Sequence, residues 1–546
     1  MMGRFRRRPR PVGSGPSPHH QGPGPGGGHS EGGGVEGAKG SKEILINSEP
    51  METRLAILSG GQLEEFFVER TAQAPLVGNV YKGRVNSVVP GIRAAFVDLG
   101  IGKNGFLYLT DIVNPSPELS EHVQLESPTG TPPAPPIAPE QQPRIQDLVR
   151  VGQELLVQVV KEPLGTKGPR LTTHLSLPGR FMVLMPMDNH FGISKRIDDP
   201  KERDRLRQLI KELNPPSDLG IIIRTAAGGA EQKHLHRDLR FLLSLWQRIK
   251  ARSMHARAPA LIHEEYDVVL RTVRDMLSDE VKKVVIDARD EFRKIHRFLC
   301  QTEPHLRDKI EWYQGEVPLL EHRGLEAEIE RIFNRKVELP SGGYCIIEQT
   351  ESLVAIDVNS GKFTGRRNLE ETAFVTNMEA AAELAKQIRL RDLGGIIIFD
   401  FIDMASQSHR QKVYNILQTA LRRDRAKTNI IFISEFGLVE MTRQRIRKSL
   451  ESVSFQECPY CHGRGSVRSA LTGAINALRQ AKRLFQKQHC REVELIVHPD
   501  IAARLQQEDR AAVQQLERQM HGRVRIKAES GIHLEEVKAI PVSGGA

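Results

Sequence analysis

The sequence predicts a multidomain α/β protein that also contains a small β-barrel. The chain has 546 residues, whereas a single domain usually has about 100–200. Residues 351–404 read as an apolar strand, a helix over residues 368–392 and a second apolar strand, with Gly394 and Gly395 as the helix stop signal. This succession predicts a parallel βαβ crossover. Residues 79–113 instead show short strands separated by Gly and Pro, which is typical of a small barrel.

Each strand of the predicted crossover carries polar side chains near its end. In SLVAIDVNSG, alternation places Asp357 and Asn359 on one face and the aliphatic Ile356 on the other. GGIIIFDFIDM is a nearly unbroken apolar run, typical of a strand buried on both faces, and it carries Asp400 near its C-terminal end. Because the two strands are parallel, these ends meet at one sheet edge, where carboxylates could hold Mg²⁺. Helix capping or pairing with Arg would also explain the two Asp residues.

Composition limits the class of protein. The formal net charge of +10 favours a polyanionic partner. Five cysteines do not make the framework of a disulfide-rich secreted domain, so a reducing compartment fits better. No apolar run reaches the roughly 18 residues of a membrane span, and no signal-peptide core follows the Arg-rich start. We therefore expect a cytoplasmic protein without a membrane span.

The N-terminal segment, residues 1–41, consists largely of Gly, Pro, His and Arg and offers little to bury. We expect a disordered basic tail. Its MMGRFRRRPR start could add non-specific RNA affinity through counterion release, or the tail could be solvated without a specific role. Structured sequence begins at about residue 42, where residues 43–49 and 53–69 read as strands, the latter around a Gly-Gly turn.

Alternation in the predicted barrel separates aromatic from aliphatic side chains. In AAFVDLG, Phe96 lies on the face opposite Val97, and in GFLYL, Phe106 and Tyr108 lie opposite the Leu residues. If the aliphatic faces form the core, the aromatics face outward, where bases of single-stranded RNA can stack on them. The alternative is that the aromatics fill the barrel. The cations nearby in the sequence are Lys82, Arg84 and Arg93.

The second half of the barrel follows a Pro-rich segment. Residues 114–143 are expected to form a long loop, after which the barrel resumes over residues 151–177. Lys161 and Lys167 lie near a Gly-rich turn in this second half. They are further candidates for contact with RNA.

GIIIRTAAGGA, which begins at Gly220, combines groups that suit a terminal phosphate. Arg224 offers a bidentate fork, Thr225 offers a hydroxyl, and Gly228 and Gly229 leave backbone N–H groups approachable. As a lone pattern it is weak, because an ordinary strand-to-helix turn also explains it.

Beyond the crossover, GLVEMTRQRIRKSL reads as a helix start with a basic cluster. This cluster could bind the scissile RNA backbone or form a solvated helix face. Its members are Arg443, Arg445, Arg447 and Lys448. From about residue 466 the chain alternates helix (470–489), strand (492–499), helix (501–521) and strand (522–528), which predicts a small α/β domain.

CPYCHGRG supplies Cys458 and Cys461, half of the four ligands that a tetrahedral thiolate zinc site needs. No second CxxC is present in the sequence. The missing pair could come from Cys345, Cys300 or Cys490, or from the same motif of a second chain, which is the economical solution. A redox CxxC is the alternative, but the usual thioredoxin-like context is absent.

The motifs INSE, YKGRV, AAFVDLG, GFLYL, IIIRTA, AIDVNSG, NMEAAAELAKQIRLRDLGGIIIFDFIDM, EFGLVEMTRQR and CPYCHGRG occur in this order from about residue 42 onward. In this combination the chain resembles the bacterial ribonuclease E/G family. The block that ends in IIIFDFIDM is long and highly specific. Because the chain lacks the long C-terminal scaffold of the larger ribonuclease E proteins, it is more similar to the ribonuclease G members.

The resemblance implies a magnesium-dependent endoribonuclease that cuts single-stranded RNA, is stimulated by a 5′-monophosphate and acts in the processing and decay of rRNA, tRNA or mRNA. By resemblance, Asp357 and Asp400 hold Mg²⁺ and Asn359 helps to position the scissile group. Arg224 and Thr225 match the pocket that senses the 5′-monophosphate.

The resemblance also implies an RNA-binding surface and a metal link. Phe96 and Phe106 match aromatic positions of an OB-fold RNA-binding domain. Cys458 and Cys461 match a Zn²⁺ link that joins two protomers, within a dimer or a tetramer.

The implied architecture is an RNase H-like subdomain interrupted by an OB-fold barrel and a sensor domain, then a DNase I-like catalytic subdomain, a zinc link and a small domain. The expected ranges are 1–41 for the tail, 42–78 and 263–333 for the RNase H-like parts, 79–175 for the OB-fold, 176–262 for the 5′-sensor, 334–455 for the catalytic subdomain, 456–466 for the zinc link and 467–546 for the small oligomerisation domain.

The expected reaction is hydrolysis that leaves a 5′-phosphate and a 3′-hydroxyl. Asp403 could be an outer carboxylate of the site, or it could serve the turn near Ser406. Two other classes are considered: a catalytically silent RNA-binding assembly protein, and a metal-dependent nuclease that acts on DNA. The acidic trio argues against the first, and competition between matched RNA and DNA oligonucleotides tests the second.

Overall fold

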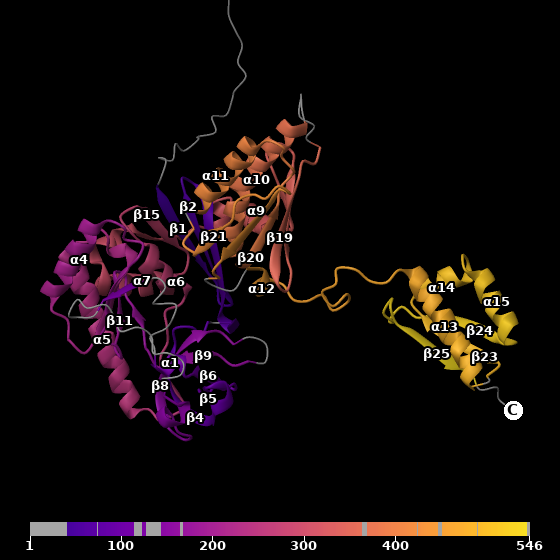
Figure 1. Cartoon of the computed structure of the whole chain (residues 1–546), viewed down its shortest axis with the longest axis horizontal. Helices are drawn as coiled ribbons and strands as arrows, with labels where there is room; N and C mark the ends of the chain where they lie inside the picture. The colour runs from indigo at the N-terminus through magenta and orange to yellow at the C-terminus, as the bar shows by residue number, and fades with distance from the viewer. Residues whose placement is uncertain are drawn as a thin grey trace, which may run out of the picture. The chain divides into compact units, whose positions relative to one another are not determined.

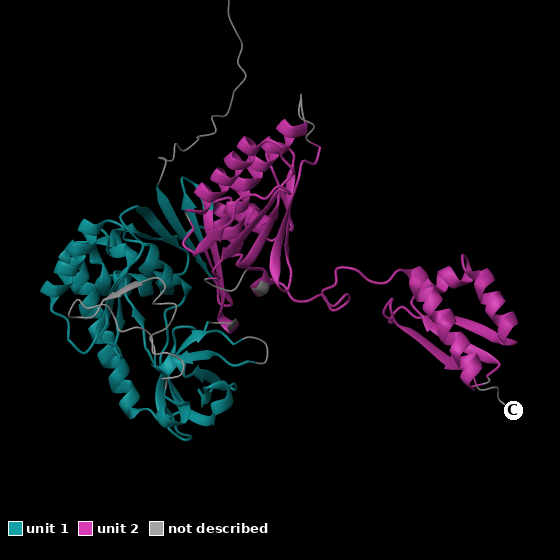
Figure 2. Cartoon of the chain, in the orientation of Figure 1, with its two compact units in different colours: residues 1–48, 56–63, 75–319 teal, residues 49–55, 64–74, 320–546 magenta. Residues whose placement is uncertain are grey.

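The computed structural model describes residues 41–73, 75–113, 123–126, 143–163, 167–362, 369–422, 424–445, 450–488 and 490–542 (Figure 1). The chain divides into two compact units (Figure 2). One comprises residues 1–48, 56–63 and 75–319, and the other comprises residues 49–55, 64–74 and 320–546. Within the described residues, no helix has the length and apolar character needed to cross a membrane.

The predicted N-terminal strands are present and belong to a five-stranded sheet. Its members are β1 (Lys42–Ser48), β2 (Glu52–Ser59), β3 (Gln62–Arg70), β15 (Val281–Ile286) and β16 (Ile310–Trp312), in the order β16-β15-β1-β2-β3. Gly60 and Gly61 join β2 to β3 with φ values of +58° and +83°. A two-residue hairpin turn of type I′ requires positive φ values at both central residues. Gly adopts such values without steric cost.

The predicted barrel is confirmed as a closed five-strand ring. The members are β4 (Val80–Val89), β5 (Ala94–Asp98), β6 (Gly105–Tyr108), β9 (Arg170–Thr172) and β8 (Glu154–Lys161), and pairing of β8 with β4 closes the ring. A further strand, β14 (Ala260–His263), pairs with β4. Short helices α1 (Thr110–Val113) and α3 (Ile145–Leu148) lie along the chain between β6 and β8.

The next sheet contains a strand that the sequence did not predict. The order is β10-β11-β13-β12-β7, with β10 (Leu177–Pro178), β11 (Met182–Met185), β12 (Phe191–Ser194), β13 (Gly220–Ile223) and β7 (Val123–Glu126). Because β7 pairs antiparallel with β12, the expectation of one long loop over residues 114–143 is wrong at this point. The rest of that segment lies outside the described residues, apart from its last residue. Helices of the same unit are α4 (Pro200–Leu213), α5 (Gln232–His255), α6 (Val268–Met276) and α7 (Arg289–Thr302), followed by the 3₁₀ segment η4 (Pro304–Lys309).

The predicted βαβ crossover forms the centre of a six-stranded sheet in the second unit. The order is β17-β18-β19-β20-β22-β21, with β17 (Lys336–Glu338), β18 (Tyr344–Gln349), β19 (Leu353–Asn359), β20 (Gly395–Asp400), β21 (Thr428–Ile430) and β22 (Leu438–Arg443). The crossover helix is α10 (Leu369–Arg391), followed by α11 (Gln407–Leu421). Asp392, with φ +48°, ends α10 two residues before the predicted Gly pair.

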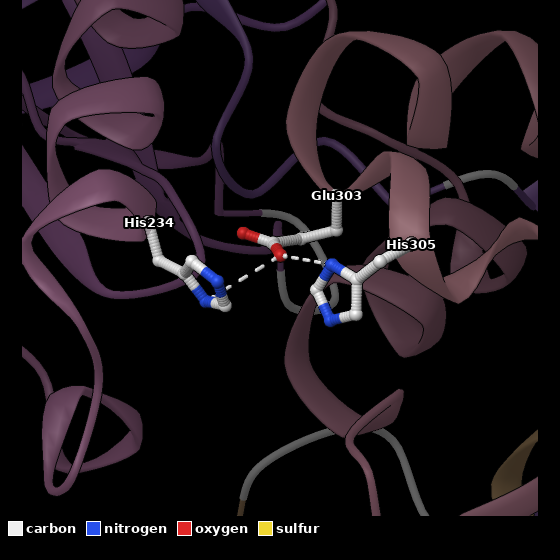
Figure 3. Close-up of side chains that lie close together, drawn as sticks. All are labelled: His234, Glu303 and His305. Atoms are coloured by element: carbon white, nitrogen blue, oxygen red, sulfur yellow. Dashed lines mark ion pairs between the residues drawn. The ribbon is translucent and has the colours of Figure 1, made fainter.

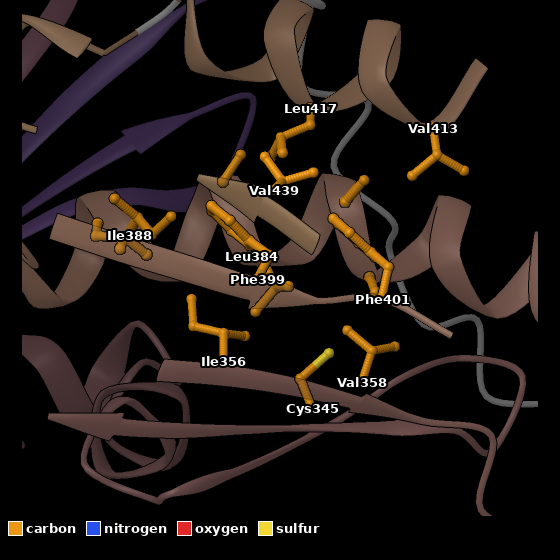
Figure 4. Packing of buried hydrophobic residues seen from close by; sticks show 14 of the residues in the cluster. Cys345, Ile356, Val358, Leu384, Ile388, Phe399, Phe401, Val413, Leu417 and Val439 are labelled. Atoms are coloured by element: carbon orange, nitrogen blue, oxygen red, sulfur yellow. The ribbon is translucent and has the colours of Figure 1, made fainter. Parts of the chain in front are cut away.

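One face of this sheet carries the core. Ile356, Phe399 and Val439 on the central strands pack with Leu384 of α10 and Leu417 of α11 (Figure 4). The other face is open: Ile396 of β20 is 49% exposed. The expectation that β20 is buried on both faces is therefore wrong. Its apolar run reflects one covered face and one apolar but accessible face, which composition alone does not distinguish.

The small C-terminal domain has one more strand than predicted, and its second predicted helix is divided. The sheet order is β24-β23-β25, and the elements are α13 (Ala470–Gln488), β23 (Glu492–Val497), α14 (Pro499–Gln506), α15 (Arg510–Met520), β24 (Arg523–Ala528) and β25 (Val537–Pro541). Ala474, Ala477, Ala481 and Phe485 place one face of α13 in the core of this domain. Shorter helices elsewhere in the second unit are α8 (Leu319–His322), α9 (Glu326–Ile332) and α12 (Leu450–Ser454). The first residue of α8, Leu319, belongs to the first unit.

Candidate active site

Strand register brings the two predicted carboxylates together. β19 and β20 are parallel neighbours, and Asp357 is the register partner of Asp400. Both side chains lie on the open face of the sheet and are exposed. Asn359, two residues beyond Asp357, donates from Nδ2 to Asp357 Oδ2 over 2.7 Å. The prediction that the crossover gathers these three residues at one sheet edge is confirmed.

The carboxylates at this edge influence one another electrostatically. Partial burial raises the pKa of Asp400, and the nearby charges of Asp357 and Asp403 raise it further. The proximity of like charges makes full ionisation costly unless a cation lies among them. Carboxylate oxygens are the ligands that Mg²⁺ prefers. The donor set and its mutual repulsion therefore fit a magnesium ion held by Asp357 and Asp400.

Two side chains of α10 that sequence reasoning missed position the segment after β20. Asn377, which is fully buried, donates from Nδ2 to the Ile402 carbonyl oxygen at 2.7 Å and accepts from the Ile402 N–H at 3.1 Å. Glu370 accepts from the N–H groups of Ala405 and Ser406 at 3.0 and 3.2 Å. Glu370 thus serves the start of α11, whereas the Ser406 side chain makes no capping bond. An amide on the apolar face of a predicted helix was the only signal for Asn377.

A glycine at the adjoining turn is required by close packing. Gly437 has φ +75°, and a Cβ there would lie 2.5 Å from the Phe401 carbonyl oxygen and 3.3 Å from Asp403 Oδ1. Any other residue would displace the chain that follows Asp400.

Arg443, expected in a basic cluster that binds RNA or forms a solvated helix face, is instead buried and bonded within the protein. It ends strand β22 rather than starting a helix, and it is only 4% exposed. Its guanidinium donates to Asp392 Oδ1 at 2.6 Å, to Asp424 Oδ2 at 2.7 Å and to the Leu393 carbonyl oxygen at 2.7 Å. Arg445 donates to the Gly394 carbonyl oxygen. The other two members of the predicted cluster lie outside the described residues.

Arg224 and Thr225 lie together where β13 ends, in the other unit. Arg224 donates from Nη1 to Asp275 Oδ1 at 2.6 Å, and its side chain is 29% exposed. Although burial acts in the opposite direction, the guanidinium groups of Arg274 and Arg224 hold the pKa of Asp275 below its usual range. Thr225 Oγ1 lies 3.0 Å from Ser194 Oγ. A charged carboxylate therefore orients Arg224 and leaves part of its fork accessible.

The two glycines that follow do not offer free backbone donors. Gly229 donates its N–H to Glu202 Oε1 at 2.9 Å, and the Gly228 N–H is bonded to the Thr225 carbonyl oxygen at 3.1 Å. This part of the predicted phosphate site is wrong, because the turn itself uses these groups.

On the barrel, the aromatic residues face outward as predicted. Val97 and Leu107 are buried, whereas Phe96 and Phe106 are partly exposed and Tyr108 is 38% exposed. The Phe96 and Phe106 ring centroids are 4.6 Å apart, and those of Phe106 and Tyr108 are 6.5 Å apart with nearly parallel planes. The alternative in which aromatics fill the barrel is excluded for these residues.

The same register row continues from the aromatics into cations. Phe96 pairs with Phe106, Phe106 with Arg170, and Arg170 with Lys161. Arg170, which sequence reasoning missed, is fixed by two bonds of 2.8 Å to Asp111 and lies over the Tyr108 ring. Lys167 is exposed.

Two of the cations predicted for this surface are engaged within the protein. Lys82 donates to the Ala256 carbonyl oxygen, Arg84 donates to the Ala258 carbonyl oxygen, and both pair with Glu154. The cations in the register row of the rings are therefore Arg170 and Lys161 rather than Lys82 and Arg84.

The CPYC motif forms a compact turn with accessible thiols. Cys458 is exposed, and Cys461 is partly exposed. Hydrogen bonds from the N–H groups of Cys461 and Tyr460, together with the Cys461 side chain, lower the pKa of Cys458. A thiolate is the form that binds Zn²⁺, so the turn fits half of a zinc site. Cys345, on β18 beside β19, is fully buried in the core (Figure 4), which excludes it as a third ligand.

Comparison with known proteins gives matches to one family over two successive segments of the chain. Residues 176–446 match the model of the Ribonuclease E/G family, and residues 457–540 match a model described as RNase E/G, Thioredoxin-like domain. Ribonuclease G of Escherichia coli (strain K12) is 39% identical over 503 residues, which cover 91% of this chain and 99% of that protein. Ribonuclease G of Haemophilus influenzae is 40% identical, with the same coverage. Ribonuclease E of Escherichia coli (strain K12) is 39% identical over 88% of this chain but 44% of its own length.

The second match corrects one expectation. The sequence predicts that a thioredoxin-like context is absent around CPYC, yet the segment that begins there matches a domain of that description. A helix N-terminus is one setting that makes a Cys reactive. In the structure α13 begins at Ala470, beyond the CPYC turn, so the thiols do not occupy that position.

Proposed function

Because the chain belongs to the ribonuclease E/G family and is by that relationship an endoribonuclease, we propose that it hydrolyses single-stranded RNA at Asp357, Asn359 and Asp400 with Mg²⁺ as cofactor. The observation that carries this proposal is the direct register pairing of Asp357 with Asp400 on the open face of the sheet. In this proposal the protein acts in RNA processing and decay in the cytoplasm, on rRNA, tRNA or mRNA.

Each residue of the site has a distinct role in the proposed mechanism. Asp357 and Asp400 would hold the ion, and Asn359 would fix one oxygen of Asp357 through the hydrogen bond described above. When bound, Mg²⁺ would supply positive charge beside the phosphodiester and would make a nearby water more acidic. Attack of water on phosphorus breaks the bond to the 3′-oxygen, which leaves a 3′-hydroxyl and a 5′-phosphate. The charge of Asp403 also raises the pKa of Asp400, so this carboxylate acts on the site electrostatically.

Substrate recognition is assigned to the first unit. Phe96 and Phe106 would stack on bases, and Lys161 and Lys167 would contact the backbone. Arg224 and Thr225 would bind the 5′-monophosphate and thereby stimulate cleavage. Cys458 and Cys461 would supply half of a zinc site, completed by the same motif of a second chain in a dimer or tetramer.

The finer architecture is part of the same proposal. We assign residues 42–78 and 263–333 to an RNase H-like subdomain, 79–175 to the OB-fold, 176–262 to the 5′-sensor, 334–455 to a DNase I-like catalytic subdomain, 456–466 to the zinc link and 467–546 to a small oligomerisation domain. The closed barrel supports the second of these assignments, since a five-strand barrel with an aromatic outer face is typical of OB-folds.

Replacing Arg224 with Lys should remove most of the preference for a 5′-monophosphate. Lysine lacks the fork that can hold Asp275 and a phosphate together. A charge-assisted hydrogen bond is worth roughly 1.5–3 kcal/mol, so the cleavage ratio between 5′-monophosphate and 5′-hydroxyl RNA should fall about 10-fold or more. The matched control is Arg207→Lys, whose guanidinium pairs with Asp204 on the surface of α4. An unchanged ratio in Arg224→Lys would remove this residue from the sensor.

Replacing Phe106 with Ala should weaken binding of single-stranded RNA without altering the chemical step. Stacking of one base contributes about 1–3 kcal/mol, which corresponds to a rise in Kd of about 5- to 150-fold. Fluorescence anisotropy with chelator present measures Kd without cleavage. The control is Ile92→Ala, which removes an exposed apolar side chain elsewhere on the barrel. Equal Kd values for the two variants would contradict the stacking role.

A further inference from the structure

A second cluster of metal-ligating side chains lies far from the acidic edge in sequence, within the first unit. His234 is in the first turn of α5, Glu303 immediately follows α7, and His305 is in η4 (Figure 3). Of the described residues, these three form the one group of His, Cys, Asp or Glu in which a donor atom from each lies within 4.8 Å of the others.

Glu303 is the centre of this cluster. Its Oε2 atom lies 3.2 Å from His305 Nδ1 and 3.7 Å from His234 Nδ1. The Glu303 side chain is only 3% exposed, and Oε2 has no hydrogen-bond partner among the described residues. A buried carboxylate oxygen without a hydrogen bond is costly and requires an explanation. Its direction toward two imidazole nitrogens points to a missing ligand.

Burial and neighbouring charges act on both His234 and Glu303. Burial, with smaller contributions from His305 and Lys233, lowers the pKa of His234. Burial also raises the pKa of Glu303 to about 7. Arg180 and Arg237 favour the charged form of Glu303, whereas Asp238 and Asp279 oppose it. The charged side chains around the cluster therefore include both signs.

We propose that His234, Glu303 and His305 form a binding site for a divalent transition metal ion of the Zn²⁺ class. Two imidazole nitrogens and one carboxylate oxygen are ligands that Zn²⁺ accepts, with the fourth position left to water. Mixed N and O ligands make Mg²⁺ the poorer fit, because that ion prefers oxygen alone. This site is separate from both the acidic edge and the CPYC turn.

The location indicates a structural role for the ion. Asp238, one turn beyond His234 on α5, accepts the backbone N–H groups of Arg180, Phe181 and Met182. A metal bound to His234 would therefore connect the start of α5 and this loop to the segment that follows α7. Bound metal should accordingly raise the thermal stability of the first unit.

The test measures Zn²⁺ content of the full chain after equilibrium dialysis, by mass spectrometry of the metal. His305→Ala removes the most exposed ligand, and Glu303→Gln removes the charge of the central ligand but keeps its side-chain volume. The control is His236→Ala, which removes an exposed histidine two residues from His234. Loss of an outer partner alone weakens metal binding about 10–100-fold, so loss of a direct ligand should cost at least as much. Each ligand variant should therefore hold about one Zn²⁺ per chain fewer than wild type at limiting metal.

The change in Tm on addition of Zn²⁺ distinguishes loss of metal binding from loss of folding. Added Zn²⁺ should raise the Tm of wild type and of His236→Ala, whereas His305→Ala should keep its metal-free Tm. A chain carrying Cys458→Ser and Cys461→Ser should still bind the ion at the His/Glu site. Equal Zn²⁺ content in wild type, His305→Ala and His236→Ala would overturn the proposal, as would equal loss in both histidine variants.

Discussion

Replacement of Asp357 or Asp400 by Asn is expected to abolish RNA cleavage while leaving RNA binding intact. Asn keeps the shape of the side chain but removes the charge that would hold Mg²⁺. Metal-ion catalysis is worth several kcal/mol of transition-state stabilisation, so the single-turnover rate should fall about 10³-fold or more. Cleavage of an end-labelled single-stranded RNA measures the rate, and fluorescence anisotropy measures Kd.

Glu440 supplies a matched control for these variants. It is an exposed carboxylate on β22 and is the register partner of Ile398, two residues before Asp400 on β20. Glu440→Gln removes one negative charge from the same open face without touching the proposed metal ligands. Its cleavage rate should stay within a few-fold of wild type. A rate for Asp400→Asn close to that of Glu440→Gln would rule out Asp400 as a ligand.

Arg443→Ala is expected to cause the largest loss of stability. Removing this guanidinium takes away the positive charge that the buried carboxylates of Asp392 and Asp424 share, and loss of one member of a buried ion pair typically costs about 3–5 kcal/mol. Calorimetric unfolding should show a clearly lower Tm for the transition of the second unit. Arg422→Ala, on the exposed end of α11, is the control and should be nearly neutral.

The same variant separates two interpretations of the basic residues near β22. If Arg443 contacted RNA, as its place in a basic cluster predicts, Arg443→Ala would weaken RNA binding and leave Tm unchanged. The structure predicts the reverse at temperatures where the variant is folded. Weakened binding with an unchanged Tm would therefore contradict the structural role.

The acidic edge was predictable because it depends on local rules. The period of two in β19 places Asp357 and Asn359 on one face, and a helical crossover connection makes β20 parallel to β19. The barrel aromatics were predictable for the same reason, since alternation places Phe96 and Phe106 opposite the aliphatic core. Resemblance to a family added the roles of these residues, which alternation does not supply.

The remaining features depend on contacts between residues far apart in the chain. Arg443 reads as a surface cation until Asp392 and Asp424 are found against it, 51 and 19 residues away. Asn377 reads as an ordinary helix residue until its bonds to Ile402 are seen. The open face of β20 was missed because an apolar run does not reveal which face the helices cover. His234 and Glu303 come together only through the packing of the unit that contains them.

The central claim is that Asp357 and Asp400 together hold the catalytic divalent ion. The most direct measurement is a titration with Mn²⁺, a paramagnetic substitute for Mg²⁺, in which electron paramagnetic resonance counts bound ions in wild type, Asp357→Asn, Asp400→Asn and Glu440→Gln. Any other Mn²⁺ site contributes equally to all four proteins. We expect both Asp variants to lose about one bound ion per chain and Glu440→Gln to keep it. Unchanged Mn²⁺ binding in both Asp variants would contradict the claim.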